Sequence, residues 1–254
     1  MSGVLAVASR EFKAYFSTPL GWVCLGAWLL ITGFFFGWSM DLYSAVSLQT
    51  ASNPFGDPID LEAYLIAPFF GNWAVVLIFL CPALSMRLFA EERHSGSFSL
   101  LRSSGLTSTQ LVLGKYLGAM AFVGVALAAT LHYPVFLMRW AEPDLGVLFA
   151  CYLGMFLLSA SFMAVGLVAS SMSSSQVVAL LSAFAILMVL WIMGLGEGAQ
   201  DQGWRDWISD VSMLPRVQPM LRGLIHGADV AYFISVIALL LFVAQQRLEL
   251  ERWQ

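Results

Sequence analysis

Charge is scarce in this sequence. Asp, Glu, Lys and Arg make up 11% of its 254 residues, whereas a soluble domain carries about 25% charged residues. The charges are also unevenly spread, because five long runs contain none of them: 14–40, 63–86, 116–138, 145–196 and 230–246. A membrane span needs roughly 20 apolar residues. The composition therefore excludes an ordinary soluble domain and predicts an all-α integral membrane protein.

The sequence also lacks the short motifs of the common catalytic sites. It contains no GxxxxGK[ST] phosphate loop, no HExxH, no GxSxG and no CxxC. Its three cysteines lie inside apolar runs, where a free thiol is commonly just buried. We therefore expect no catalytic residue, metal site or cofactor in this chain. We also expect no nucleic-acid binding, since the sequence has no basic stripe.

Charged residues are missing from the middle of the apolar runs as well. Ion-coupled carriers place such groups inside the membrane, because the transported charge needs partners there. Here His132 is the only residue among the His, Asp, Glu, Lys and Arg types that lies well inside a run. The energy for any transport must therefore come from outside the spans.

Six spans fit into the apolar runs. The run 145–196 is long enough for two, and the polar stretch SSMSSSQ at 170–176 divides it. Eight Lys and Arg residues fall on the side of the two termini and four on the other side, which predicts that both termini are cytoplasmic. We expect a single domain, 1–254, with spans at 20–40, 66–88, 114–138, 145–169, 176–195 and 230–245.

The first 18 residues form a separate unit. Val4 and Phe12 share one side of a helix, and Lys13 lies on the other. This pattern predicts an amphipathic elbow helix in the membrane interface, with an ordinary N-terminal flank as the alternative. In the span that follows, Gly33 and Gly37 have the spacing that permits close helix packing.

The connector 90–108, between the second and third spans, concentrates charge in this apolar chain. Its charged residues precede a pair of leucines: Glu91, Glu92, Arg93, Leu100 and Leu101. A short helix with this apolar face suits docking into a groove of a soluble partner. A charged anchor in the membrane interface is the alternative.

The connector 196–229 lies on the far side of the predicted membrane. Trp204 and Trp207 give it an aromatic character, and Pro215 and Gly223 interrupt it. The content predicts short helices that dip back towards the membrane, where protein or water must surround the irregular backbone. An amphipathic helix on the membrane surface explains the pattern equally well.

The connector 90–108 and the residues after it resemble the signature of ABC-2 type transporter permeases. The matching residues are Glu91, Glu92, Ser95, Gly96, Leu100, Leu101 and the sequence LGKY at 113–116. More specifically, the chain resembles the gliding-motility-associated permeases. The stretches that carry this closer resemblance are REFKAYFSTPLGWV, PALSMRLFAEE and SASFMAVGLVASSMSSSQVVAL.

The resemblance implies a membrane domain that works with other chains in the bacterial cytoplasmic (inner) membrane. The connector would hold a coupling helix that contacts a separate ABC ATPase, present in two copies, which binds the ATP and Mg. A second permease copy, or a paralogous permease, would complete the assembly. The expected ATPase-coupling residues are Glu91, Glu92, Arg93, Ser95, Gly96, Leu100, Leu101 and Lys115.

Two functions follow from the resemblance. In the first, the chain is the permease subunit of a bacterial ABC exporter, and its connector 196–229 forms re-entrant helices near the outer gate. In the second, a gliding-type envelope complex uses the chain to transmit force or to assemble an extracytoplasmic machine, and no solute moves. An extracytoplasmic auxiliary protein is then an expected partner.

Overall fold

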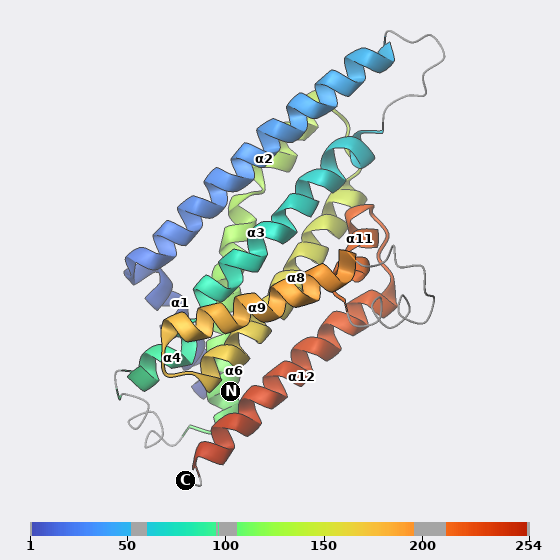
Figure 1. The fold of residues 1–254 in the computed structure, drawn as a ribbon. Helices are drawn as coiled ribbons and strands as arrows, with labels where there is room; N and C mark the ends of the chain where they lie inside the picture. Colours follow the sequence, from blue (N-terminus) through green and yellow to red (C-terminus); the bar gives the residue numbers. More distant parts are fainter. Residues whose placement is uncertain (1, 52–59, 95, 97–105, 196–211, 253–254) are drawn as a thin grey trace.

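The computed structural model of the chain describes residues 2–51, 60–94, 96, 106–195 and 212–252 (Figure 1). Regular structure in these ranges consists of helices alone. They are, in chain order, α1 (Ser2–Ser17), α2 (Pro19–Ala51), the π-helical turn η1 (Glu62–Ile66), α3 (Ala67–Ser85), α4 (Arg87–His94), α6 (Ser108–Ala129), α7 (His132–Trp140), α8 (Leu145–Met172), α9 (Gln176–Leu195), α11 (Leu214–Leu221) and α12 (Gly227–Arg252).

Six helical stretches are long and apolar enough to cross a membrane. They are Pro19–Thr50, Glu62–His94, Ser108–Trp140, Leu145–Met172, Gln176–Gly194 and Gly227–Leu250. The predicted all-helical class and the six predicted spans are confirmed over the part of the chain that the structure describes. The first stretch runs past its predicted end, because no Gly or Pro interrupts residues 41–51.

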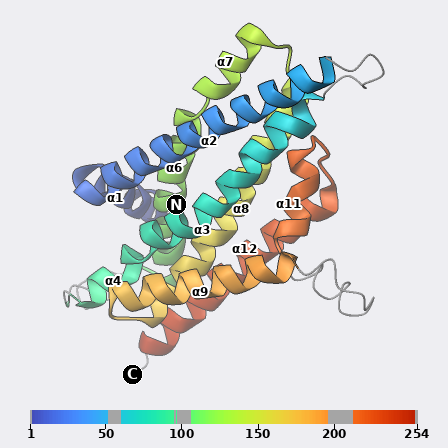
Figure 2. The same ribbon diagram turned by 45° about the horizontal axis from the view of Figure 1, so that its top comes forward.

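The six stretches differ in how far the chain itself covers them. Within the most apolar 18 residues of α8, 78% are buried by the rest of the chain, against 17% in the corresponding part of α12. The stretches that contain α3 and α6 resemble α8, whereas α2 and α9 resemble α12. Accordingly α8 lies at the centre of the bundle, in contact with α3, α4, α6, α9, α11 and α12 (Figure 2).

An aromatic cluster fixes the centre of the bundle. Trp28 of α2 donates its indole N–H to the carbonyl oxygen of Ala126 in α6 at 3.0 Å. The Trp28 ring lies 5.1 Å from that of Trp73 in α3, which lies 5.8 Å from that of Tyr152 in α8. Both pairs meet edge to face, the geometry that aromatic quadrupoles favour. Four helices thus share one packed centre.

The two ends of the bundle carry different short helices. α1, α4 and the last turns of α12 lie together at one end, here termed the α4 end (Figure 1). α11 lies at the opposite end, here termed the α11 end (Figures 1 and 2). α6 begins at the α4 end with a capping box, in which Thr107 and Gln110 bond each other's backbone N–H groups at 3.2 Å.

A sharp bend separates α1 from α2. Thr18 stands between them, and its hydroxyl donates to the carbonyl oxygen of Ala14 at 2.9 Å. Pro19 then opens α2, where its missing N–H leaves no bond unmade. A Cβ at Gly21 would overlap the carbonyl oxygen of Tyr15, so the bend leaves no room for a side chain at this position.

Candidate coupling site

The α4 end contains a joint between α3 and α4, formed by Ser85 and Met86. α3 ends at Ser85, and Met86 alone separates it from α4. Pro82 precedes the joint within α3 and offers no N–H to the preceding turn, which weakens the helix there. The N–H of Met86 still donates to the carbonyl oxygen of Pro82 at 2.9 Å. α4 is therefore a short helix on a softened connection.

Four charged side chains join α4 to α1 and α6. The Nζ atom of Lys115, at the start of α6, lies 2.9 Å from Oε1 of Glu11 in α1 and 2.8 Å from Oε1 of Glu92 in α4. The Nη2 atom of Arg10 lies 2.9 Å and 3.0 Å from the same two oxygens. We term Arg10, Glu11, Glu92 and Lys115 the charge cluster. Its two cations and two carboxylates bring three helices together.

Three of the four side chains of the charge cluster are withdrawn from water, whereas that of Arg10 is 53% exposed. The Lys115 side chain is 1% exposed, and those of Glu11 and Glu92 are 12% and 15% exposed. Burial by itself would raise the pKa of Glu11, but the ammonium of Lys115 and the guanidinium of Arg10 outweigh it and hold that pKa below the ordinary carboxyl value. Phe89 lies beneath the cluster, with its ring centroid 5.2 Å from Nζ of Lys115.

Two glycines of α6 bring α1 close enough to complete the charge cluster. A Cβ at Gly114 would lie 2.6 Å from Cβ of Val7, and one at Gly118 would lie 2.7 Å from the carbonyl oxygen of Ala8. Both distances are too short for a real side chain. The two glycines are four residues apart and so share a face of α6. Larger residues there would push Glu11 away from Lys115.

A comparison with known families identifies the class of the chain. The model of the family described as ABC-2 family transporter protein matches residues 6–201. The chain belongs to the ABC-2 transporter family. It is thus a multi-pass membrane permease of an ABC transporter, a class that works with an ABC ATPase and is dimeric as a rule. A search of curated proteins gave no match.

The structure places the predicted coupling residues of the permease differently, and their coupling role stays a prediction. On α4, Glu91 is exposed and lies 3.6 Å from Nε of Arg87, whereas Glu92 points inward to Lys115. Arg93 is the next residue of α4, and Gly96 follows the helix with a positive φ of 72°. Ser95, Leu100 and Leu101 lie outside the described residues. The structure thus joins Glu92 and Lys115 directly, although they are far apart in sequence.

Sequence reasoning did not find two members of the charge cluster, Arg10 and Glu11. Their signal was present, because an adjacent Arg and Glu interrupt an otherwise apolar helix in REFKAYF. The sequence also predicted close helix packing at Gly33 and Gly37. Within the chain a Cβ at Gly33 would lie 3.3 Å from Oη of Tyr133, and one at Gly37 would meet nothing within 4 Å. Packing at this pair stays a prediction.

The α11 end holds the predicted outer residues that the structure describes. Pro215 lies in the first turn of α11, and Gly223, with φ of 83°, follows its end. Val217 and Met220 are fully buried against the bundle. Trp204 and Trp207 lie outside the described residues. The described part of this connector is thus a helix packed into the bundle, and its position relative to the membrane stays a prediction.

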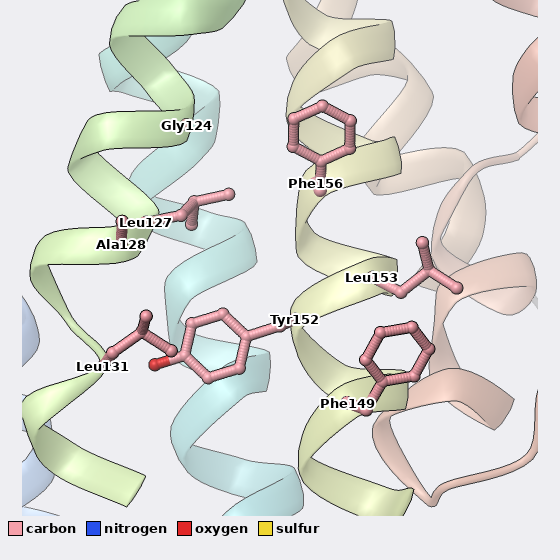
Figure 3. Close-up of a pocket in the computed structure, with 8 residues that line it drawn as sticks. All are labelled: Gly124, Leu127, Ala128, Leu131, Phe149, Tyr152, Leu153 and Phe156. Carbon is pink, nitrogen blue, oxygen red and sulfur yellow. The ribbon is translucent and has the colours of Figure 1, made fainter. Parts of the chain in front are cut away.

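An apolar groove opens between α6 and α8 (Figure 3). It has a volume of about 270 Å³ and is lined by Gly124, Leu127, Ala128, Leu131, Phe149, Tyr152, Leu153 and Phe156. Figure 3 shows the Tyr152 hydroxyl pointing towards α6, where it donates to the carbonyl oxygen of Thr130 at 3.0 Å. The groove has no charged lining. Its chemistry is that of a surface in contact with acyl chains.

Proposed function

We propose that this permease is the membrane subunit of a bacterial ABC exporter in the inner membrane. The proposed complex contains two permease subunits, identical or paralogous, and two separate ATPases that hold the ATP and Mg. The charge cluster is the observation that carries the proposal. It ties α4, at the base of the connector 90–108, to α1 and to the start of the third span.

The same proposal assigns a direction to the bundle. The α4 end faces the cytoplasm, where the ATPase is, and α1 lies as an elbow helix in the membrane interface. The excess of Lys and Arg on the side of the termini supports this direction. α11 then lies towards the outer surface, and an extracytoplasmic auxiliary protein is an additional expected partner on that side.

The arrangement supports a simple mechanical cycle. An ATPase that binds the connector displaces α4 when it closes on ATP. Because Glu92 shares its cations with Glu11, α1 and the start of α6 are displaced with α4. The joint at Met86 lets α4 swing without bending the whole of α3. The permease contributes no catalytic group in this cycle, only a rigid block that converts closure of the ATPase into movement of its spans.

Docking of the ATPase is tested by changing the apolar residues of the connector. The tagged permease is purified with its associated ABC ATPase, which is identified by mass spectrometry and by its phosphate loop. Leu100→Asp with Leu101→Asp is expected to abolish co-purification. Leu250→Asp is the matched control, because Leu250 is 61% exposed at the same end of the bundle. Unchanged recovery of the ATPase with the double variant would refute this docking site.

The export step needs its own measurement. Inside-out membrane vesicles with the complex are given ATP and a radiolabelled total extract of the producing cells. ATP-dependent uptake above that of vesicles without the permease is expected. If the complex hydrolyses ATP without any uptake, the force-transmitting function described above replaces export.

A further inference from the structure

A residue of α8 caps the first turn of α4. Ser170 is fully buried, and its Oγ accepts hydrogen bonds from the N–H groups of Phe89 at 3.0 Å and Ala90 at 3.1 Å. The same hydroxyl donates to the carbonyl oxygen of Met86 at 3.0 Å. The first N–H groups of a helix lack partners in their own helix, and a preceding residue usually supplies them. Here a different span supplies the cap, directly at the joint.

The backbone of α8 also lies close to the joint one turn earlier. A Cβ at Gly166 would overlap Oγ of Ser85 and lie 2.6 Å from Cβ of Ser85. Gly166 and Ser170 are four residues apart and therefore face the same side of α8. The joint is thus both packed against α8 and hydrogen-bonded to it. A displacement of the joint has to displace this part of α8.

The other half of α8 holds α11 in a similarly close way. A Cβ at Gly154 would lie 3.1 Å from Cβ of Met220, and one at Gly223 would lie 2.7 Å from Cγ2 of Val147. Cys151 adds a contact, with its Sγ 3.5 Å from the carbonyl oxygen of Leu221. At each of the two glycines a side chain of one helix therefore packs directly on the backbone of the other segment, which brings α11 close to α8.

The part of α8 between these two contacts is well suited to transmit movement. Gly154 and Ser170 are sixteen residues apart in one unbroken helix without proline, which separates them by about 24 Å. The helix is surrounded by the other spans on most of its surface. α3 connects the same two ends, but Pro82 weakens it within one turn of the joint.

We propose that Ser170 is a positioning residue that passes the displacement of α4 to α8 and, through α8, to α11 at the opposite end of the bundle. The inference rests on the proposed function, in which the ATPase moves α4. It adds a route across the membrane that bypasses the weakened part of α3. The hydroxyl is the functional group, because it bonds both the first turn of α4 and the carbonyl oxygen before it.

The route is tested by following α11 while Ser170 is changed. Gln218 is exposed on α11, and Gln218→Cys provides a label site for a membrane-impermeant maleimide. The native thiols of Cys24, Cys81 and Cys151 are buried and give little background. The permease with its co-purified ATPase is labelled in nanodiscs without nucleotide and after trapping with ATP and vanadate. Trapping is expected to change the labelling rate at position 218.

Ser170→Ala is expected to reduce this nucleotide-dependent change about fivefold, as the loss of a hydrogen-bonded partner does to an equilibrium. ATPase binding and basal hydrolysis are expected to persist, and Ser170→Thr, which retains a hydroxyl, to restore the change. Ser171→Ala is the matched control. Ser171 is also fully buried, but its hydroxyl bonds only its own helix, at the carbonyl oxygen of Val168.

Each outcome decides between the two proposals. Failure of any ABC ATPase to co-purify with the wild-type chain would overturn the proposed function and this inference together. An unresponsive position 218 in an intact complex, or a Ser170→Ala response equal to that of the wild type, would overturn the inference alone. If Ser170→Ala does not reach the membrane, Met220→Ala loosens the other contact of α8. An unchanged response at position 218 in that variant would equally refute the route.

Discussion

The two ends of α8 hold their short helices by different chemistry. At the α4 end, the Ser170 hydroxyl fixes α4 by accepting hydrogen bonds from its N–H groups, and the charge cluster ties α4 to α1 and α6. At the α11 end, α11 meets α8 through apolar shape, because Met220 rests against Gly154 and Val217 is buried among apolar neighbours. An ion pair at this end, between Arg216 and Asp229 at 3.4 Å, joins α11 to α12 and not to α8. A hydrogen bond or ion pair needs a particular partner atom in a particular direction, whereas apolar packing depends mainly on the volume of the side chains.

This difference fits two ways of holding a short helix so that it moves with its neighbours, by charge at the α4 end and by close packing at the α11 end. The ion pairs of Lys115 resist separation, because parting them would leave charges without partners away from water. The close contacts of α11 with α8 leave no room for added volume. We therefore expect a change of charge to destabilise the packing at the α4 end most, and a change of side-chain volume to destabilise the packing at the α11 end most.

The largest effect is expected from removing the buried ammonium of the charge cluster. Lys115→Met retains the length of the side chain but leaves Glu11 and Glu92 with less positive charge. Removing one partner of a buried ion pair destabilises a protein by about 3–5 kcal/mol, and the lower end applies because Arg10 still contacts both carboxylates. Thermal unfolding of the purified permease in detergent measures the loss.

Lys13→Met is the control for this change, because Lys13 is exposed on α1. The substitution removes the same charge at the same end of the bundle, and no measurable loss is expected. Equal melting temperatures of the Lys115→Met variant and the wild type would show that the cluster does not hold the helices together.

A smaller effect is expected from added volume at the α11 end. Gly154→Val would push against Cβ and Sδ of Met220, which lie 3.1 Å and 3.3 Å from the position of the new Cβ. Overpacking of this kind destabilises a core by about 1–3 kcal/mol. The destabilisation is expected to be independent of salt and to increase the labelling of Gln218→Cys. Unfolding at two salt concentrations, together with labelling, tests both.

Gly124→Val is the matched control on α6. A Cβ at Gly124 would meet nothing within 4 Å, and the side chain would enter the groove of Figure 3. We expect an unchanged melting temperature and unchanged labelling at position 218. A drop in melting temperature as large as that of Gly154→Val would mean that any added volume in a span destabilises the bundle. The proposed difference between the two ends would then be wrong.

The six spans could be predicted from sequence because length and lack of charge are local properties. So could the separate first helix, which follows from its helical spacing. The end of α2 was placed too early, because the hydrophobic signal stops before the helix does. A polar helix that continues beyond the apolar run leaves no composition signal.

The contacts between helices could not be predicted from the sequence. GxxxG occurs at Gly33 and at Gly114, and the spacing is identical in both. Only the second pair faces a helix of this chain closely, since α1 folds back onto α6. Similarly, Ser170 belongs to the serine-rich stretch 170–176, which was interpreted as a simple divider between two spans. Its role as a cap depends on the crossing of α8 and the joint, which no local pattern encodes.

The smallest effect, and the most selective, is expected from acid. The cluster lowers the pKa of Glu11, so Glu11 stabilises the folded state fully above its unfolded pKa of about 4.3. That stabilisation is lost as the pH falls through the lower, folded pKa. Between pH 6 and pH 3.5, backbone hydrogen-exchange protection of α1 is therefore expected to fall, while that of the middle of α8, which contains no Asp, Glu or His, stays constant. α11 is not the reference, because its Arg216 pairs with Asp229.

Glu11→Gln separates this effect from general acid unfolding. The variant cannot gain a proton at position 11, so the protection of its α1 is expected to vary less with pH, from a lower starting value. The contact of α8 with α11 at Gly154 is apolar and does not titrate. An equal loss of protection in α1 and in the middle of α8 of the wild type would mean that acid opens the whole bundle. The loss in α1 could then not be assigned to the charge cluster, and the α4 end could not be separated from the rest of the bundle.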